Sequence, residues 1–318
     1  MKHLLIKTTA VSVLSWVIGS SLAMAAPLKV VSSFSILADM VQQVGGDKIE
    51  SRTIVGPEGD AHSFEPRPSD SKTLQDADLL FINGAQFEEW LPRLVESAGY
   101  QGKVVAAIEG VPLRAYAEEE EGHTYSLETS HHDDHEHHDH DHGDYDPHAW
   151  QSLEHAHVYI SNIRNALIEA DPAHETYYQQ QADAYQKKLK ALQAEMRTAF
   201  EQLPKTSRTV VTSHDAFAYL GQDYDIEFLS LLGASNQAEP SAKELAGLID
   251  FMRDNQVKAV FVENISNPKL LQQIANETGA QLGAPLYSDA LAKAPHPADH
   301  YLGLMRWNAE ALLKALSS

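Results

Sequence analysis

Three histidines and one aspartate, far apart in the sequence, are the residues best suited to chemistry. They are His62, His148, His214 and Asp289. Three of them follow segments with the apolar character of β-strands, whereas the second histidine precedes an expected helix. Ligands of open α/β sheets bind outside the carboxyl ends of the strands. We therefore expect a binding site where these segments end, with two of the four side chains from each half of the chain.

The four side chains would present three imidazole nitrogens and one carboxylate oxygen. Such a closed set suits a tetrahedral Zn²⁺ ion, whose bonds to histidine nitrogen are about 2.0–2.1 Å long. Imidazole ligands disfavour Mg²⁺ and Ca²⁺, which prefer shells of oxygen, although Cu²⁺ and Ni²⁺ could compete in vitro. A single histidine in such a place is more often a surface or capping residue. The spacing alone therefore leaves both a metal site and unconnected surface residues open.

Four acidic residues could support or replace these ligands. Glu65, Asp146 and Asp215 lie close in sequence to the three histidines and could accept hydrogen bonds that orient the imidazoles. Local turn and capping bonds explain these three acids equally well. Glu263 ends a segment expected to be a buried strand, and it is an alternative carboxylate ligand.

Composition and missing motifs exclude several other kinds of protein. The chain has 318 residues, no cysteine and a formal net charge of −21. Without cysteine it has no disulfide framework, thiolate metal site or cysteine nucleophile. Its negative charge repels phosphate backbones, so no nucleic-acid partner is expected. The sequence also lacks a phosphate-binding loop, a dinucleotide-binding glycine motif, a serine nucleophile elbow and a zinc-protease helix motif.

Strand and helix signals alternate at short intervals on both sides of a long polar helix. Segments such as 78–83 (DLLFIN) and 258–263 (KAVFVE) are almost continuously apolar, as in a parallel sheet covered on both faces. We predict an α/β protein of two lobes, each with a small, mostly parallel sheet and flanking helices. The predicted divisions are a signal peptide at 1–25, an N-terminal lobe at 26–171, a connecting helix at 172–204 and a C-terminal lobe at 205–318.

The connecting helix is expected to be one rigid strut between the lobes. Residues 172–203 are rich in Gln, Ala, Lys and Glu, and they would span roughly 45 Å as a single helix. Two helices joined by a kink are the alternative. The apolar stripe of this helix consists of Tyr178, Ala182, Tyr185, Leu189, Leu192 and Met196.

Residues 117–146 form a segment of acids and histidines without Lys or Arg. Such a composition cannot bury an apolar face, so we expect a disordered loop. Its histidines could form weak metal sites, because flexible chelation loses conformational entropy on binding. The alternative is a solvated charge run that metals decorate incidentally. The candidate accessory ligands are His131, His132, His135, His137, His138, His140 and His142.

The first 25 residues are typical of a secretory signal peptide. Lys2 and Lys7 accompany a mostly apolar stretch, and residues 23–25 form an A-x-A cleavage site. An N-terminal membrane anchor is the alternative, but the apolar stretch is shorter than the roughly 20 residues that a spanning helix needs. We therefore expect a protein exported to the periplasm and cleaved near Ala26.

Four short motifs resemble the metal-binding substrate-binding proteins of bacterial ABC uptake systems. They are GPEGDAHSFEPRPSD (56–70), DPHAW (146–150), SHDAFAYL (213–220) and LYSDAL (286–291). The resemblance covers essentially the whole chain after the signal segment and is greatest to periplasmic zinc-binding members. It implies two lobes bridged by a single long helix and hand-over of a metal to a membrane permease. The implied metal ligands, in the cleft between the lobes, are His62, His148, His214 and Asp289.

The residue at position 214 bears on the choice of metal. Manganese members of this family typically carry a carboxylate at the matching position, so the resemblance implies Zn²⁺, and three nitrogen ligands agree. We predict a monomer that captures Zn²⁺ for an ABC permease and catalyses no reaction. A periplasmic metallochaperone is a second candidate partner. The alternatives are a protein of the same architecture that prefers Mn²⁺ or Fe²⁺, and an exported zinc hydrolase with an open coordination position.

Overall fold

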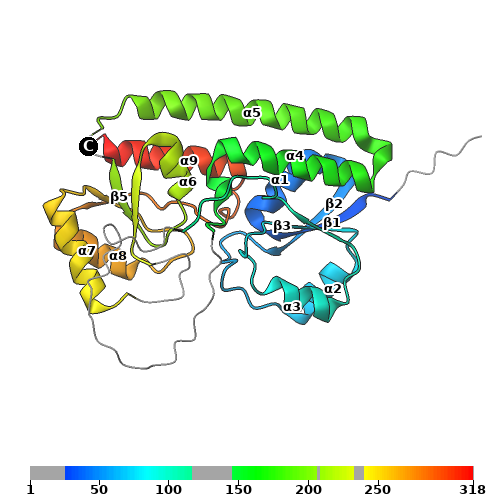
Figure 1. The fold of residues 1–318 in the computed structure, drawn as a ribbon, viewed down its shortest axis with the longest axis horizontal. Helices are drawn as coiled ribbons and strands as arrows, with labels where there is room; N and C mark the ends of the chain where they lie inside the picture. The colour runs from blue at the N-terminus through cyan, green and yellow to red at the C-terminus, as the bar shows by residue number, and fades with distance from the viewer. Residues whose placement is uncertain (1–25, 117–144, 206–207, 233–239, 318) are drawn as a thin grey trace, which may run out of the picture.

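The computed structural model describes residues 26–116, 145–205, 208–232 and 240–317. In these ranges two parallel sheets of four strands lie toward opposite ends of the molecule (Figure 1). Both sheets have the same order, with the second strand at one edge, followed by the first, third and fourth. The strands are β1 (Leu28–Phe34), β2 (Ile49–Val55), β3 (Leu79–Ile82) and β4 (Lys103–Ala106), then β5 (Thr209–Thr212), β6 (Glu227–Ser230), β7 (Ala259–Val260) and β8 (Gln281–Leu282).

Helices alternate with these strands along the chain, which confirms the predicted α/β fold of two parallel-sheet lobes. We call the sheet β1–β4 with α1–α4 the first lobe, and the sheet β5–β8 with α6–α9 the second lobe. The described helices are α1 (Ser35–Gly45), α2 (Pro68–Gln75), α3 (Leu91–Ala98), α4 (Leu153–Ala170), α5 (Glu175–Glu201), α6 (Ala218–Tyr224), α7 (Ala242–Asp254), α8 (Lys269–Thr278) and α9 (Tyr301–Leu316).

Local sequence explains where several of these elements lie. Leu79, Leu80 and Phe81 of β3 are buried, as predicted for a strand covered on both faces. A capping box begins α7, because the Ser241 hydroxyl accepts the Glu244 N–H and the Glu244 carboxylate accepts the Ser241 N–H. These short-range bonds fix the helix start without help from the rest of the fold.

The last helix begins at Tyr301. Residues before it form a turn in which the Asp299 N–H donates to the His296 carbonyl over 3.0 Å. The Asp39 carboxylate of α1 then accepts the Tyr301 N–H over 2.9 Å. A side chain from the other lobe therefore caps α9, which no local pattern could reveal.

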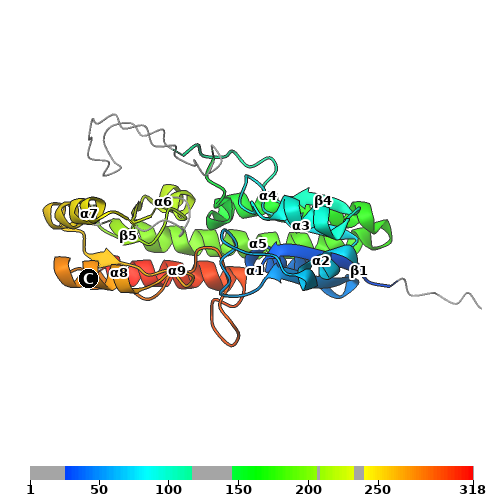
Figure 2. The same cartoon turned by 90° about the horizontal axis from the view of Figure 1, so that it is seen from below.

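The long helix α5 runs along both lobes and spans about 40 Å. It packs against α4 and α1 of the first lobe and against α9 and α6 of the second. Figure 2 shows α4 and α9 on opposite sides of it. A 3₁₀ turn, Pro172–His174, precedes the helix, which then continues unbroken to Glu201. All six residues of the predicted apolar stripe are buried, so the expectation of one helix without a kink is confirmed.

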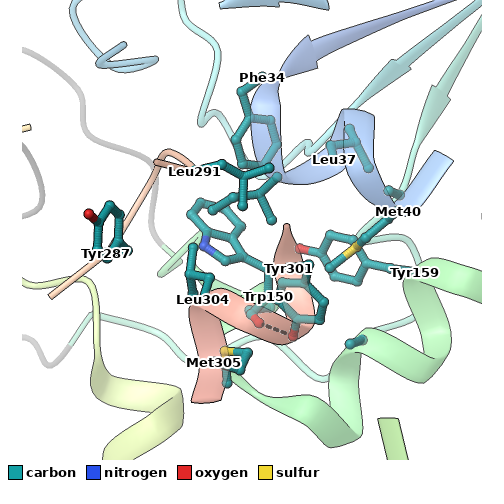
Figure 3. Close-up of a cluster of buried hydrophobic side chains, with 14 of the residues drawn as sticks. Phe34, Leu37, Met40, Trp150, Tyr159, Tyr287, Leu291, Tyr301, Leu304 and Met305 are labelled. Carbon is teal, nitrogen blue, oxygen red and sulfur yellow. Dashed lines mark hydrogen bonds between the residues drawn. The ribbon is translucent and has the colours of Figure 1, made fainter. Parts of the chain in front are cut away.

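Apolar side chains of both lobes form one continuous core where the lobes meet (Figure 3). Trp150 lies between Phe34 of the first lobe and Leu291 and Leu304 of the second. The Tyr301 hydroxyl donates to the Trp150 carbonyl over 2.5 Å. Because rotating one lobe against the other would expose these buried groups to water, the core and α5 together favour a fixed arrangement of the lobes.

Several predicted features fall partly or wholly outside the described residues. These include the signal peptide at 1–25 and the seven accessory histidines. The predicted loop extended to residue 146, but Tyr145 forms an antiparallel bridge with Ala115, and Asp146 is buried. Within the described ranges, no helix combines the length and the apolar character that crossing a bilayer requires.

We expect the radius of gyration to be the same with and without bound metal. The shared core and the continuous α5 oppose a wide opening of the lobes, so release would involve movement of a local segment. Small-angle X-ray scattering on the zinc-loaded and chelator-treated protein measures this directly. A large expansion after metal removal would contradict the expected rigidity.

Candidate metal centre

His62 reaches the centre from the loop that follows β2. Its N–H donates to the Asp60 carboxylate over 2.9 Å, which forms a tight local turn. The Trp90 indole donates to the Ala61 carbonyl over 2.7 Å and ties this turn to the rest of the first lobe. The His62 ring lies edge-on to Phe87, with ring centres 4.6 Å apart. Two hydrogen bonds to the Ala61–His62 peptide group therefore hold the backbone that carries the imidazole.

His148 is completely buried and is oriented by the carboxylate of Asp146. One carboxylate oxygen accepts the His148 N–H over 2.9 Å and lies 2.8 Å from the ring Nδ1. With Nδ1 acting as the donor, the lone pair of Nε2 faces the centre. The Asn83 amide donates to the Pro147 carbonyl over 3.0 Å, and the buried Glu88 carboxylate accepts the Asn83 N–H over 2.7 Å. The segment that carries His148 is thus fixed to the end of β3.

His214 follows β5 and is oriented by Glu263, which follows the neighbouring strand β7. One oxygen of Glu263 accepts the His214 N–H over 2.9 Å, and the other lies 2.5 Å from the ring Nδ1. Glu263 therefore lies behind His214 and is not one of the four grouped donors, which favours Asp289 over the alternative that Glu263 is the carboxylate ligand. The Nε2 atom of His214 remains directed toward the centre, as in His148.

Asp289 follows β8, and its carboxylate lies close to all three imidazoles. One carboxylate oxygen is 3.1 Å from Nε2 of His214 and 3.6 Å from Nε2 of His62. The other oxygen is 3.6 Å from Nε2 of His148. Asp289 is fully buried, and neither of its oxygens accepts a well-aligned hydrogen bond from a described residue. A buried carboxylate in this condition is unfavourable unless a cation compensates its charge.

The structure brings the four predicted ligands together, with one donor atom of each within 4.8 Å of the others. Nε2 of His62 and Nε2 of His148 are 3.1 Å apart. Four ligands at zinc bond lengths in tetrahedral geometry lie about 3.3 Å from one another, so these spacings fit a single ion with little movement. Among the described residues this is the only such group of histidines and acids.

Charges at the centre shift the pKa values of two of its members. Burial lowers the pKa of His214, but the charges of Glu263 and Asp289 outweigh burial and hold that pKa well above its usual value. Burial likewise raises the pKa of Asp289, yet the imidazoles of His214 and His148 hold it below its usual range. Without a metal, a proton on His214 therefore balances the buried carboxylates.

The other acids proposed from the sequence as supporting residues differ in their contacts with the site. Asp146 orients its histidine as expected. Glu65 is exposed and has no described bond to the site. Asp215 is partly buried, and burial followed by the nearby Asp146 charge raises its pKa. Sequence reasoning missed the parts played by Asn83 and Glu88, which act through a main-chain carbonyl and leave no spacing signal.

Comparison with known proteins identifies the family. A family model described as zinc-uptake complex component A, periplasmic, matches residues 30–315. The chain belongs to this family of metal-binding substrate-binding proteins of ABC transporters, as its motifs suggested. Such proteins act with a membrane permease, and they are binding proteins rather than enzymes.

Relatives of this chain are named for different metals. The iron-binding protein YfeA of Yersinia pestis is 34% identical over 288 residues, which cover 90% of this chain and 85% of that protein. A manganese-bound periplasmic metal-binding protein from Candidatus Liberibacter asiaticus has a TM-score of 0.77 at 28% identity, covering 91% of this chain and 99% of that one. The periplasmic zinc-binding protein TroA from Treponema pallidum has a TM-score of 0.78 at 25% identity, covering 92% and 99%.

Metal affinity should fall as pH falls. The loss of affinity should begin at a pH above about 6.5, the ordinary pKa of histidine. A metal must displace the proton on His214, and the raised pKa of that imidazole keeps the proton bound over a wider pH range. Each displaced proton costs about tenfold in affinity per pH unit. Chelator competition at several pH values measures the slope, and calorimetry in two buffers counts the protons. Affinity independent of pH would contradict this account.

Proposed function

We propose that this protein captures Zn²⁺ outside the cytoplasm and delivers it to the permease of an ABC importer. The observation that carries the proposal is the set of three imidazole nitrogens and one carboxylate oxygen, closely spaced and buried. A closed set of four protein ligands suits capture of an ion, because it leaves no coordination position for an activated water.

The donor set favours Zn²⁺ over the other metals for which relatives are named. Nitrogen donors bind Zn²⁺ more tightly than Mn²⁺ or Fe²⁺, as the Irving–Williams order describes. The two orienting carboxylates, Asp146 and Glu263, fix the imidazole tautomers and make the ring nitrogens better donors. Preference for Mn²⁺ or Fe²⁺ is the second candidate, supported by the manganese and iron names of similar proteins.

Release to the permease would begin at His62. The side chain of His62 is 11% exposed, whereas the side chains of His148, His214 and Asp289 are fully buried. His62 also lies in a loop, and loops rearrange at lower cost than helices or central strands. Displacement of this loop would open one ligand position while the lobes stay in place.

The proposed location of the protein and the proposed role of its histidine-rich segment rest on the sequence. We expect a monomer in the periplasm, with the signal peptide removed near Ala26. The histidines between His131 and His142 would collect zinc weakly and raise its concentration near His148. A periplasmic metallochaperone remains a candidate source of the metal.

The zinc affinity of the exported protein, measured in competition with a strong chelator, tests the proposal. The affinity for Mn²⁺, the alternative metal, is measured in the same way. We expect one tight Zn²⁺ per chain, held more tightly than Mn²⁺. His214→Ala should weaken zinc binding by more than about 100-fold, because an inner ligand matters more than the outer partners worth 10–100-fold. His157→Ala is the control, since this histidine of α4 lies outside the group. Tighter binding of Mn²⁺, or equal affinities of the two variants, would contradict the proposal.

A further inference from the structure

Two chain segments of the first lobe pair beside the metal centre. Ala115 and Tyr145 form an antiparallel bridge, and the Asp146 N–H donates to the Arg114 carbonyl over 2.9 Å. We call residues 114–116 and 145–146 the clasp. Asp146 is thus both a clasp residue and the group that orients His148.

A tyrosine of the second lobe joins the two segments of the clasp. The hydroxyl of Tyr219, in α6, accepts the Arg114 N–H over 3.0 Å and donates to the Asp146 carbonyl over 2.9 Å. The Arg114 guanidinium donates to the Ala218 carbonyl and to the Gln222 side chain. One buried oxygen therefore bridges both segments and ties them to a helix of the other lobe.

The bridging hydroxyl lies a short covalent path from a metal ligand. The main-chain carbonyl of Asp146 accepts its hydrogen bond, while the side chain of the same residue holds the His148 ring. Burial, with a contribution from the Asp146 charge, raises the pKa of Tyr219 to about 12, so the hydroxyl keeps its proton and remains a donor. Removing the hydroxyl would leave a buried carbonyl without this partner and free the segment to move.

We propose that Tyr219 is a positioning residue of the metal centre, whose hydroxyl fixes Asp146 and through it His148, and thereby slows metal dissociation. The inference rests on the proposed function, because it takes the four grouped residues as the metal site. It adds a contact between lobes that controls how long the metal stays bound. Asn83 holds the same segment from the first lobe, so His148 is fixed from both sides.

A second tyrosine of α6 provides a matched control. Tyr224 lies on the same helix and is also buried, but its hydroxyl has no hydrogen-bond partner among the described residues. Tyr224→Phe therefore removes the same atom from the same helix without touching the clasp. Ile249 of α7 belongs to a core cluster separate from the one that contains Tyr219. Ile249→Val is therefore a control for stability, since such a change costs about 0.5–1.5 kcal/mol.

The test measures zinc dissociation from the full exported chain, loaded with one equivalent of Zn²⁺ and mixed rapidly with excess chelator. Tyr219→Phe should release zinc about tenfold faster than wild type, as expected for loss of an outer partner. Tyr224→Phe and Ile249→Val should release it at the wild-type rate. Arg114→Ala, which loses the guanidinium contacts but keeps the main-chain bond, should accelerate release by a smaller factor. Thermal unfolding of the zinc-free variants compares their stabilities.

Two results would overturn the positioning role of Tyr219 and leave the proposed zinc capture standing. One is release by Tyr219→Phe at the rate of Tyr224→Phe. The other is equal acceleration by Ile249→Val, which would show that lower stability suffices to speed release. If wild type itself holds no tight zinc, or if His148→Ala releases it no faster, the proposed function fails first and the positioning role falls with it.

Discussion

The structure depends on one constraint, the burial of the Asp289 carboxylate among three imidazoles. An ionised carboxylate removed from water is strongly unfavourable unless hydrogen bonds or a cation compensate it. Asp289 is fully buried and has no well-aligned hydrogen bond from a described residue, so its charge must be balanced at the centre itself. A proton on His214 can do this, and so can a divalent metal bound to all four side chains. Binding is then an exchange of one cation for another, which makes metal capture sensitive to pH.

The fold meets this constraint by bringing four separate segments to one point. Three of the four grouped residues follow parallel strands, two of them in the second sheet, and His148 begins the segment that leads into α4. The helix α5 and the shared core around Trp150 hold the two sheets in a fixed relation. Asp146 and Glu263 then orient one imidazole each. Donor geometry is therefore largely set before an ion arrives, which lowers the entropy lost on binding.

Sequence reasoning succeeded where the signal was local and failed where it was not. The apolar run of β3 and the stripe of α5 are short-range patterns, and each predicted its element. Residue type, position after strands and family motifs also predicted the four residues that the structure groups. Glu263 was only an alternative ligand, and its contact with His214 had no local signal, because the pairing of β5 with β7 brings together segments that are far apart in sequence. The start of α9 likewise has no local signal, since Asp39 caps it from the other lobe.

The most direct test of the central claim is a crystal structure of the protein grown with one equivalent of Zn²⁺, with anomalous diffraction recorded at the zinc edge. The account predicts one strong peak between Nε2 of His62, His148 and His214 and the carboxylate of Asp289, with bonds of about 2.0–2.2 Å. It also predicts that Asp146 and Glu263 keep their contacts with the two ring Nδ1 atoms. A peak away from these four side chains, or a zinc ion bound to only some of them and to water, would contradict the account.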